Sequence, residues 1–247
     1  MTVWPGSQRM RKRQKVNTPV GFDKRRVSRA LFSLNREKGL EERLVRISGL
    51  FRDRRYAENP LGGGPESPEI FRVSFDEFDC VTYVETVLAL SCSKTPARFF
   101  RELRHLRYKS GKVDWFRRNH FMTAWLRRNI ARGAVADLTR GRQSIPKTRL
   151  LSGVPGLPPG RVTFRLFPKR RYPKVRSLIR TGDIIMFVST KKHLDVFHMG
   201  MLIRDGDQVL MRHATRSAGK VVEQALIDFM RSNRMTGFIL ARPLCRP

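Results

Sequence analysis

The sequence has little cysteine and no long apolar run, and each shortage excludes a class of protein. Its three cysteines, Cys80, Cys92 and Cys245, are too few and too scattered for a disulfide framework or a zinc site. No stretch approaches the roughly 20 apolar residues of a transmembrane helix. The N-terminus is basic, but no apolar run follows it, so it lacks the hydrophobic part of a signal peptide. As written, the sequence predicts a cytoplasmic protein, whereas a wrongly placed start would allow a periplasmic or cell-envelope location.

Acidic residues are also scarce. There are 21 Asp and Glu against 51 Lys and Arg, which gives a formal net charge of +30. Such an excess attracts polyanions, among them nucleic acid, anionic lipid and acidic cell-wall polymers. No compact basic motif stands out, so a solvated basic surface explains the charge equally well. The charge alone does not name a function.

Length and hydrophobic content indicate one folded domain behind a basic arm. A chain of 247 residues with 40% hydrophobic residues can bury a full core. Residues 1–37 are basic and poor in periodic apolar residues, so we expect an extended or disordered arm there. Residues 38–247 then form the domain.

Helices are expected in the first half of this domain and antiparallel strands in the second, which indicates an α+β fold. Apolar residues at three- and four-residue steps predict a helix from Gly39, and Gly and Pro make residues 59–65 a loop. The other expected helices are at 80–90, from the Thr95-Pro96 pair onward, at about 121–131 and at 226–231. The expected strands are near 162–166 and at 183–188, 196–203, 208–214 and 237–241.

Asp205-Gly206 lies between two apolar runs and predicts a tight two-residue hairpin. With these residues as the loop, His198 pairs directly with His213, and their Cβ atoms lie about 5 Å apart. Gly200, on the same face, leaves room for the end of a helix. A slipped register would instead separate the two histidines.

Cys80 opens one of the predicted helices, with Asp79 able to cap its first turn. Unpaired N–H groups at a helix start and a nearby imidazole both lower the pKa of a thiol. Nucleophilic catalysis needs a nucleophile, a base and a group that orients the base, and these roles can be filled by Cys80, His198 and His213 in that order. The N–H groups at the helix start can supply part of an oxyanion hole. A cysteine that opens an amphipathic helix is more often a core residue, however. Spacing alone leaves both interpretations open.

Several motifs, in this order, resemble the NlpC/P60 superfamily. They are a loop with Tyr and Gly, Asp79-Cys80, a strand with Gly182-Asp183, His198-Met199-Gly200, and His213-Ala214. More narrowly, the chain resembles the DUF1460 branch, the N-acetylmuramoyl-L-alanine amidase-like family, over about residues 40–245. The segments that carry this resemblance are 78–85, 118–121, 137–139, 213–215 and 242–244.

The resemblance implies a papain-like fold, in which the nucleophile helix packs on an antiparallel sheet. It also implies hydrolysis of an amide in peptidoglycan or muropeptides, within the branch the bond between N-acetylmuramic acid and L-alanine. By the same resemblance, Cys80 is the nucleophile, His198 the general base and acid, and His213 the orienting group. We expect neither a metal nor a cofactor. Members of this branch are commonly exported, which disagrees with the absence of a visible export signal.

Further residues are assigned by matching motifs. Tyr56 matches the Tyr of the superfamily loop, so its hydroxyl could help to hold the oxyanion or the substrate, although packing is an alternative. Arg118, Asn119 and His120 are expected to line or brace the cleft as substrate-binding residues. Asn119 could equally cap the following helix.

Three residues are expected to have structural roles. We place Asp137 and Thr139 behind the site. Cys92 lies over three helical turns from Cys80, so it cannot share the site and we expect it in the core.

Two classes of function compete with the amidase. A stem-peptide endopeptidase or an acyltransferase would use the same fold and residues. A non-catalytic relative would use the basic surface to hold nucleic acid or another polyanion, although such relatives usually lose the Cys or His that this chain retains. The sequence leaves the oligomeric state open.

Overall fold

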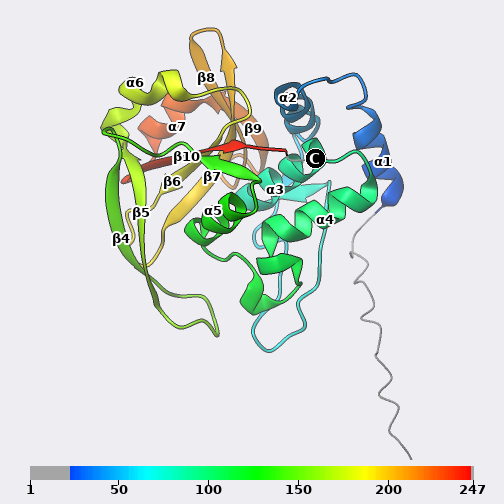
Figure 1. The fold of residues 1–247 in the computed structure, drawn as a ribbon, viewed down its shortest axis with the longest axis horizontal. Coiled ribbons are helices and arrows are strands. Elements are labelled where there is room, and N and C mark those ends of the chain that lie inside the picture. The colour runs from blue at the N-terminus through cyan, green and yellow to red at the C-terminus, as the bar shows by residue number, and fades with distance from the viewer. Residues whose placement is uncertain (1–22, 246–247) are drawn as a thin grey trace, which may run out of the picture.

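The computed structural model describes residues 23–245 and shows a mixed α+β protein (Figure 1). Within that range, seven helices accompany ten strands that belong to one sheet, in the order β2-β1-β9-β8-β7-β6-β10-β5-β4, with β3 also paired to β10. The pairs are antiparallel except for β1 with β2. The coarse α+β prediction is therefore confirmed.

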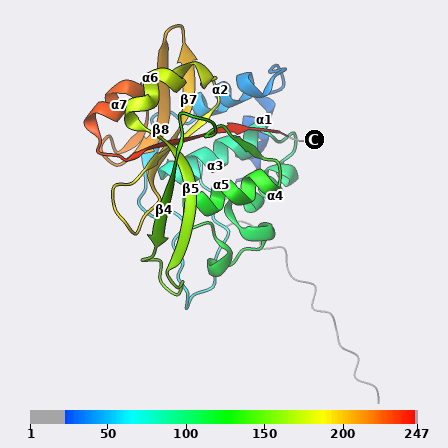
Figure 2. The same cartoon turned by 60° about the vertical axis from the view of Figure 1, so that its left-hand side comes forward.

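The helices lie on both faces of the sheet (Figures 1 and 2). Helices α2 to α5 contribute to one apolar cluster and α6 and α7 to a second cluster on the opposite face. The helices are α1 Lys24–Phe32, α2 Leu40–Leu50, α3 Cys80–Ser91, α4 Pro96–Arg107, α5 Met122–Ala131, α6 Tyr172–Val175 and α7 Leu226–Ser232. The predictions of α2, α3, α4, α5 and α7 are confirmed. In the described part of the chain, none of the helices combines the length and the apolar character needed to cross a membrane.

Helix α1 corrects the expectation that residues 1–37 form an extended or disordered arm. Val27, Ala30 and Leu31 are buried at helical spacing, and α1 packs against α4. Arg26 also forms an ion pair with Asp76, at 2.6 Å. The apolar stripe is short and surrounded by basic residues, which hid its period in the sequence. Residues 1–22 of the expected arm lie outside the described residues.

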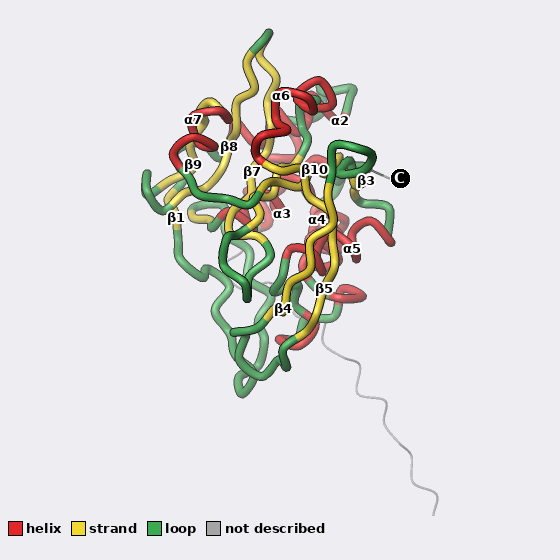
Figure 3. The backbone as a smooth tube through the Cα atoms, turned by 90° about the vertical axis from the view of Figure 1, so that its left-hand side faces the viewer, coloured by secondary structure: helices red, strands yellow, loops and turns green. Residues whose placement is uncertain are grey.

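Four of the predicted strands form the centre of the sheet, but others were missed. The strands are β1 Arg55–Tyr56, β2 Glu77–Phe78, β3 Val135–Asp137, β4 Ile145–Leu151, β5 Gly160–Pro168, β6 Ile184–Val188, β7 Val196–Asp205, β8 Gln208–Thr215, β9 Lys220–Ala225 and β10 Gly237–Pro243. One strand was expected near 162–166, where the structure has the long hairpin of β4 and β5 (Figure 3). Basic residues and threonine interrupt the apolar residues of both strands, so their apolar signal is weak.

The turn between β7 and β8 consists of Gly206-Asp207, and the expected Asp205-Gly206 turn is wrong. Asp205 stays in the ladder, paired with Gln208. Gly206 has φ of +55°, as the first central residue of a type II′ turn does, and glycine favours that position. The register is shifted by two residues from the expected one. His198 and His213 therefore share a face as diagonal rather than directly opposed neighbours.

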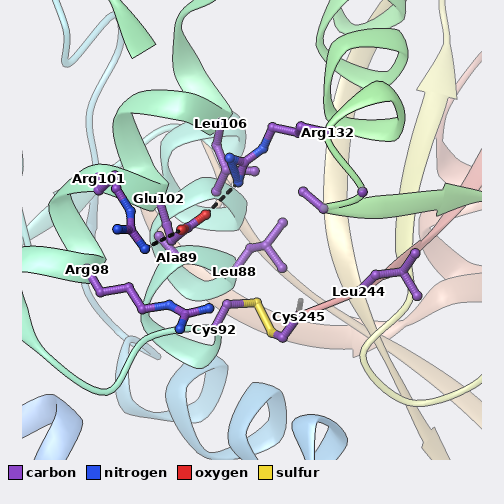
Figure 4. A pocket seen from close by; sticks show the side chains of 12 residues that line it. Leu88, Ala89, Cys92, Arg98, Arg101, Glu102, Leu106, Arg132, Leu244 and Cys245 are labelled. Carbon is purple, nitrogen blue, oxygen red and sulfur yellow. Dashed lines mark hydrogen bonds and ion pairs between the residues drawn. A yellow bond between two sulfur atoms is a disulfide. The ribbon is translucent and has the colours of Figure 1, made fainter. Parts of the chain in front are cut away.

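Cys92 is bonded to Cys245, so the interpretation of Cys92 as a simple core residue is wrong. Cys92 follows the last turn of α3, and Cys245 follows β10, 153 positions further along the chain. Figure 4 shows this disulfide at the wall of a small pocket that also carries Arg98, Arg101 and Arg132. The separation in sequence concealed the pairing, because only the tertiary fold brings the C-terminal ends of α3 and β10 together.

Candidate active site

Cys80 is the first residue of α3, and the start of this helix is fixed by reciprocal capping. The carboxylate of Asp79 accepts hydrogen bonds from the backbone N–H of Thr82 at 2.7 Å and from its hydroxyl at 2.8 Å. The Thr82 hydroxyl in turn accepts from the backbone N–H of Asp79 at 3.0 Å. This arrangement satisfies two backbone donors and holds the thiol at the helix terminus.

The sulfur of Cys80 meets the sheet where β7 and β8 part. The ladder between these strands ends at the pair Met201–Arg212, although both strands continue beyond it. The backbone N–H of Met199, in the stretch that β8 does not pair, lies close enough to the Cys80 thiol to lower its pKa. The nucleophile candidate therefore lies beside the residue that follows His198.

His198 and His213 are in direct contact. Nε2 of His198 lies 2.6 Å from Nδ1 of His213, which requires a hydrogen bond between the two rings. His213 is only 1% exposed, whereas His198 is partly buried. The sequence led us to expect a helix end beside Gly200, and this expectation is wrong. Met211 and the Arg212 carbonyl occupy the space beside it.

Aromatic rings from β6, β7 and α7 lie near the ring of His198. Its ring stacks against that of Phe229, with centroids 5.1 Å apart and planes at 25°. Phe187 and Phe197 lie further away, at 6.4 and 6.5 Å. Sequence reasoning missed Phe229, because nothing in the pattern of α7 links it to His198.

Burial favours the neutral forms of the thiol and the imidazoles. Burial, and secondarily the Asp79 carboxylate, raise the pKa of Cys80 to about 12, against backbone N–H groups that lower it. Burial lowers the pKa of His198 to about 3, with His213 contributing, and that of His213 to about 4. The sequence led us to expect a lowered thiol pKa, and the structure shows the opposite, because desolvation outweighs the donors at the helix start.

Tyr56 is placed next to the start of α3 by the short parallel pair β1–β2. Tyr56 is in register with Phe78, two residues before Cys80. Burial raises the pKa of the Tyr56 hydroxyl, and the charges of Cys80 and Asp79 add to the effect. The hydroxyl is therefore a protonated donor near the sulfur at neutral pH.

Arg118 is held inside the protein by Glu69. Nη2 and Nε of Arg118 donate to the Glu69 carboxylate at 2.6 and 2.8 Å, and Nη2 also donates to the Gly62 carbonyl. The guanidinium lies over the Trp115 ring, 4.8 Å from its centroid. These contacts join the glycine-rich loop after Tyr56 to the segment before α5.

Asn119 and His120 are also bound within the protein. The Asn119 side chain donates to the Leu106 carbonyl and accepts from Arg128. It does not cap α5, whose N-cap is Phe121. Nε2 of His120 donates to the Trp115 carbonyl at 2.8 Å, and the two rings lie 4.4 Å apart. The geometry places these residues as braces, and contact with a substrate remains a prediction.

Asp137 and Thr139 form a local turn. The Asp137 carboxylate accepts from the Thr139 N–H at 2.7 Å, and the Thr139 hydroxyl bonds both backbone groups of Leu240. Across residues 23–245, no cluster of three or more His, Cys, Asp or Glu side chains is arranged to hold a metal ion.

Comparison with known proteins agrees with the motif resemblance. The profile of the AmiA-like family, described as N-acetylmuramoyl-L-alanine amidase-like, matches residues 46–238. A comparison with curated proteins finds no match.

Solved structures share the fold. A Legionella pneumophila protein assigned to DUF1460 has 24% sequence identity and a TM-score of 0.78, over 90% of this chain and 94% of that one. An N-acetylmuramoyl-L-alanine amidase from Bacteroides uniformis has 24% identity and a TM-score of 0.75, over 83% of this chain and 99% of its own.

Proposed function

Since the chain belongs to the AmiA-like family of N-acetylmuramoyl-L-alanine amidase-like proteins, we propose that it is a cysteine amidase acting on peptidoglycan fragments. The target bond joins the lactyl group of N-acetylmuramic acid to L-alanine. The single observation that carries the cysteine mechanism is the His198–His213 contact, on the strand whose Met199 N–H lies at the Cys80 thiol. The nucleophile helix packed on an antiparallel sheet supports a papain-like, NlpC/P60-type arrangement.

The two imidazoles define the direction of proton transfer. With Nε2 of His198 bonded to His213, Nδ1 is the nitrogen left to take the Cys80 proton. That transfer requires neutral His198 to carry its proton on Nε2, so Nδ1 of His213 accepts the hydrogen bond and the His213 proton lies on Nε2. His213 thus fixes the tautomer in which His198 can act as a base.

Catalysis then proceeds in two steps. The sulfur attacks the lactyl carbonyl as its proton moves to His198, and the collapsing adduct takes that proton onto the L-alanine nitrogen, which leaves as an amine. Water, deprotonated by His198, then splits the thioester and releases a lactyl carboxylate. The backbone N–H of Cys80 and the Tyr56 hydroxyl are the donors we assign to the developing oxyanion.

Incubation with defined muropeptides tests the proposal. Mass spectrometry should find a free lactyl carboxyl on the sugar and an intact stem peptide, and a chelator should not change the rate. Cys80→Ala should abolish cleavage with an unchanged melting temperature. Cleavage between stem-peptide residues would favour the endopeptidase alternative. Activity in Cys80→Ala would refute the cysteine mechanism, and salt-dependent DNA binding with an unreactive Cys80 would favour the polyanion-binding alternative.

We also propose that the protein works in an oxidising compartment, such as the periplasm. The support is the Cys92–Cys245 bond, because structural disulfides are rare in the reducing cytoplasm. Thiol labelling of the native cells before lysis should find Cys92 and Cys245 oxidised and Cys80 reduced. Labelling of all three thiols would place the protein in a reducing compartment.

A further inference from the structure

The histidine pair lacks an ionic partner for the charge that catalysis would place on it. In the part of the chain that the structure describes, no carboxylate raises the pKa of His198 or His213. The proton transfer under the proposed function nevertheless converts His198 to an imidazolium. An imidazolium in an apolar site is costly unless a neighbouring group stabilises it.

Phe229 offers such a group. Its ring lies nearly parallel to the His198 imidazole at 5.1 Å, within the distance at which a cation is stabilised by a ring face. It also meets His213 at 5.3 Å, nearly perpendicular, at 80°. One side chain thus contacts both imidazoles and limits how each can rotate.

The Phe229 ring is itself held in place. It is 7% exposed and packs on Phe187 with centroids 4.6 Å apart. Asn233 donates to the Phe229 carbonyl at 2.8 Å and fixes the end of α7. Because β6 and its own helix hold the ring, Phe229 keeps a fixed orientation beside the two histidines.

His213 gives a second reason to regard the Phe229 ring as part of the site. Its Nε2 is buried and, among the residues that the structure describes, has no hydrogen-bond partner. Under the proton arrangement above, this nitrogen carries a hydrogen. The Phe229 ring lies 5.3 Å from the His213 ring and nearly perpendicular to it, so an aromatic ring lies beside a donor that no oxygen or nitrogen of the described residues accepts from.

We propose that Phe229 is a positioning residue for His198. Its ring keeps the imidazole in the orientation that bonds His213, and its face stabilises the imidazolium in the place of a carboxylate. This inference rests on the proposed function for the need to charge His198, but the ring contacts are independent of the substrate. The titratable group in contact with His198 is His213 from β8, and its aromatic neighbours are Phe187, Phe197 and Phe229.

Alkylation by iodoacetamide tests the inference without a substrate. Cys80 is the one free thiol, since the other two of the three cysteines are bonded, so the labelling rate reports proton transfer from Cys80 to His198. Phe229→Leu should lower this rate at pH 7.5 about tenfold, the size of one cation–π contact. On muropeptides, kcat should fall by a similar factor while KM stays constant.

Phe238→Leu is the matched control. Phe238 belongs to the same apolar cluster and contacts Phe167 and Tyr172. It should lower the melting temperature as Phe229→Leu does and leave both rates within twofold. Equal losses of rate in the two variants, or an unchanged rate in Phe229→Leu, would overturn the inference.

Fluorination of Phe229 keeps the volume of the ring and removes its negative face, so it covers the case in which Phe229→Leu does not fold. The labelling rate should fall stepwise with each added fluorine, and a constant rate would refute the role. Failure of the proposed function is a separate result: wild-type protein would then leave muropeptides intact, whatever the labelling rates.

Discussion

Nε2 of His198 lies 2.6 Å from Nδ1 of His213, and this contact assigns each ring nitrogen a role. His213 occupies Nε2 of His198, which leaves Nδ1 for the proposed proton transfer from Cys80. The two residues reach this position as diagonal neighbours on β7 and β8, at the point where those strands part.

His213→Ala should lower kcat/KM by about tenfold or more, because it leaves a donor of His198 unpaired and frees the ring to turn. His213→Gln, which retains an acceptor oxygen, should recover part of the loss. Steady-state kinetics on a muropeptide checks this. Equal activity in wild type and His213→Ala would remove His213 from the site.

Acid should destabilise the protein through the buried histidines. The pKa of His198 falls from 6.5 to about 3 on folding, so the unfolded state binds more protons between these values. The contribution of His198 to stability is complete above pH 6.5 and is lost as the pH falls, by about 1.4 kcal/mol per pH unit. Denaturant titrations from pH 4 to 7 should show a shallower decline in His198→Asn than in wild type, and identical slopes would contradict the buried neutral imidazole.

Alkali should act through Cys80 with the opposite sign. Folding raises the pKa of Cys80 from 9.0 to about 12, so the unfolded state loses its proton first. The stability contribution is complete below pH 9 and is lost as the pH rises toward 12. The melting temperature of Cys80→Ala should therefore fall less between pH 9 and 10.5 than that of wild type. Parallel curves would show that the thiol titrates normally in the folded protein.

Loss of the Cys92–Cys245 bond should lower the free energy of unfolding by about 5 kcal/mol. The bond closes a loop spanning 153 positions, which restricts the unfolded chain strongly in the chain-entropy model. Cys92→Ser with Cys245→Ser and reduction of the wild type should give equal losses in denaturant titrations. Because the bond is at the opposite end of α3 from Cys80, kcat at low temperature should remain unchanged in the double variant.

Breaking the Arg118–Glu69 pair should cost about 3–5 kcal/mol, because either partner alone would be a buried, uncompensated charge. The side chains are 9% and 1% exposed. Glu69→Gln and Arg118→Met should each lower the melting temperature, and the two together should lower it less than the sum of the single changes. A variant of Arg118 with raised KM and normal stability would instead indicate direct contact with the substrate.

Local signals in the sequence were sufficient where a few neighbouring residues decide the structure. The apolar period of α2, the caps at Asp79 and Thr95, and the loop at 59–65 all depend on contacts within one or two turns. Helix α1 and strand β4 were not predicted, because basic residues dilute their apolar patterns and tertiary packing stabilises them.

The sequence by itself determined helices α2 to α5 and α7 and the strands β5 to β8 and β10. It also determined the placement of Cys80 at a helix start, the shared face of His198 and His213 and, through ordered motifs, the family. Tertiary structure alone decided which residues form the β7–β8 turn, that Cys92 finds Cys245, and that Phe229 stacks on His198. It also reversed the expected direction of the Cys80 pKa. The reason is physical: caps and side-chain alternation are set by neighbours along the chain, whereas register, disulfide pairing and desolvation depend on what the whole fold places around each group.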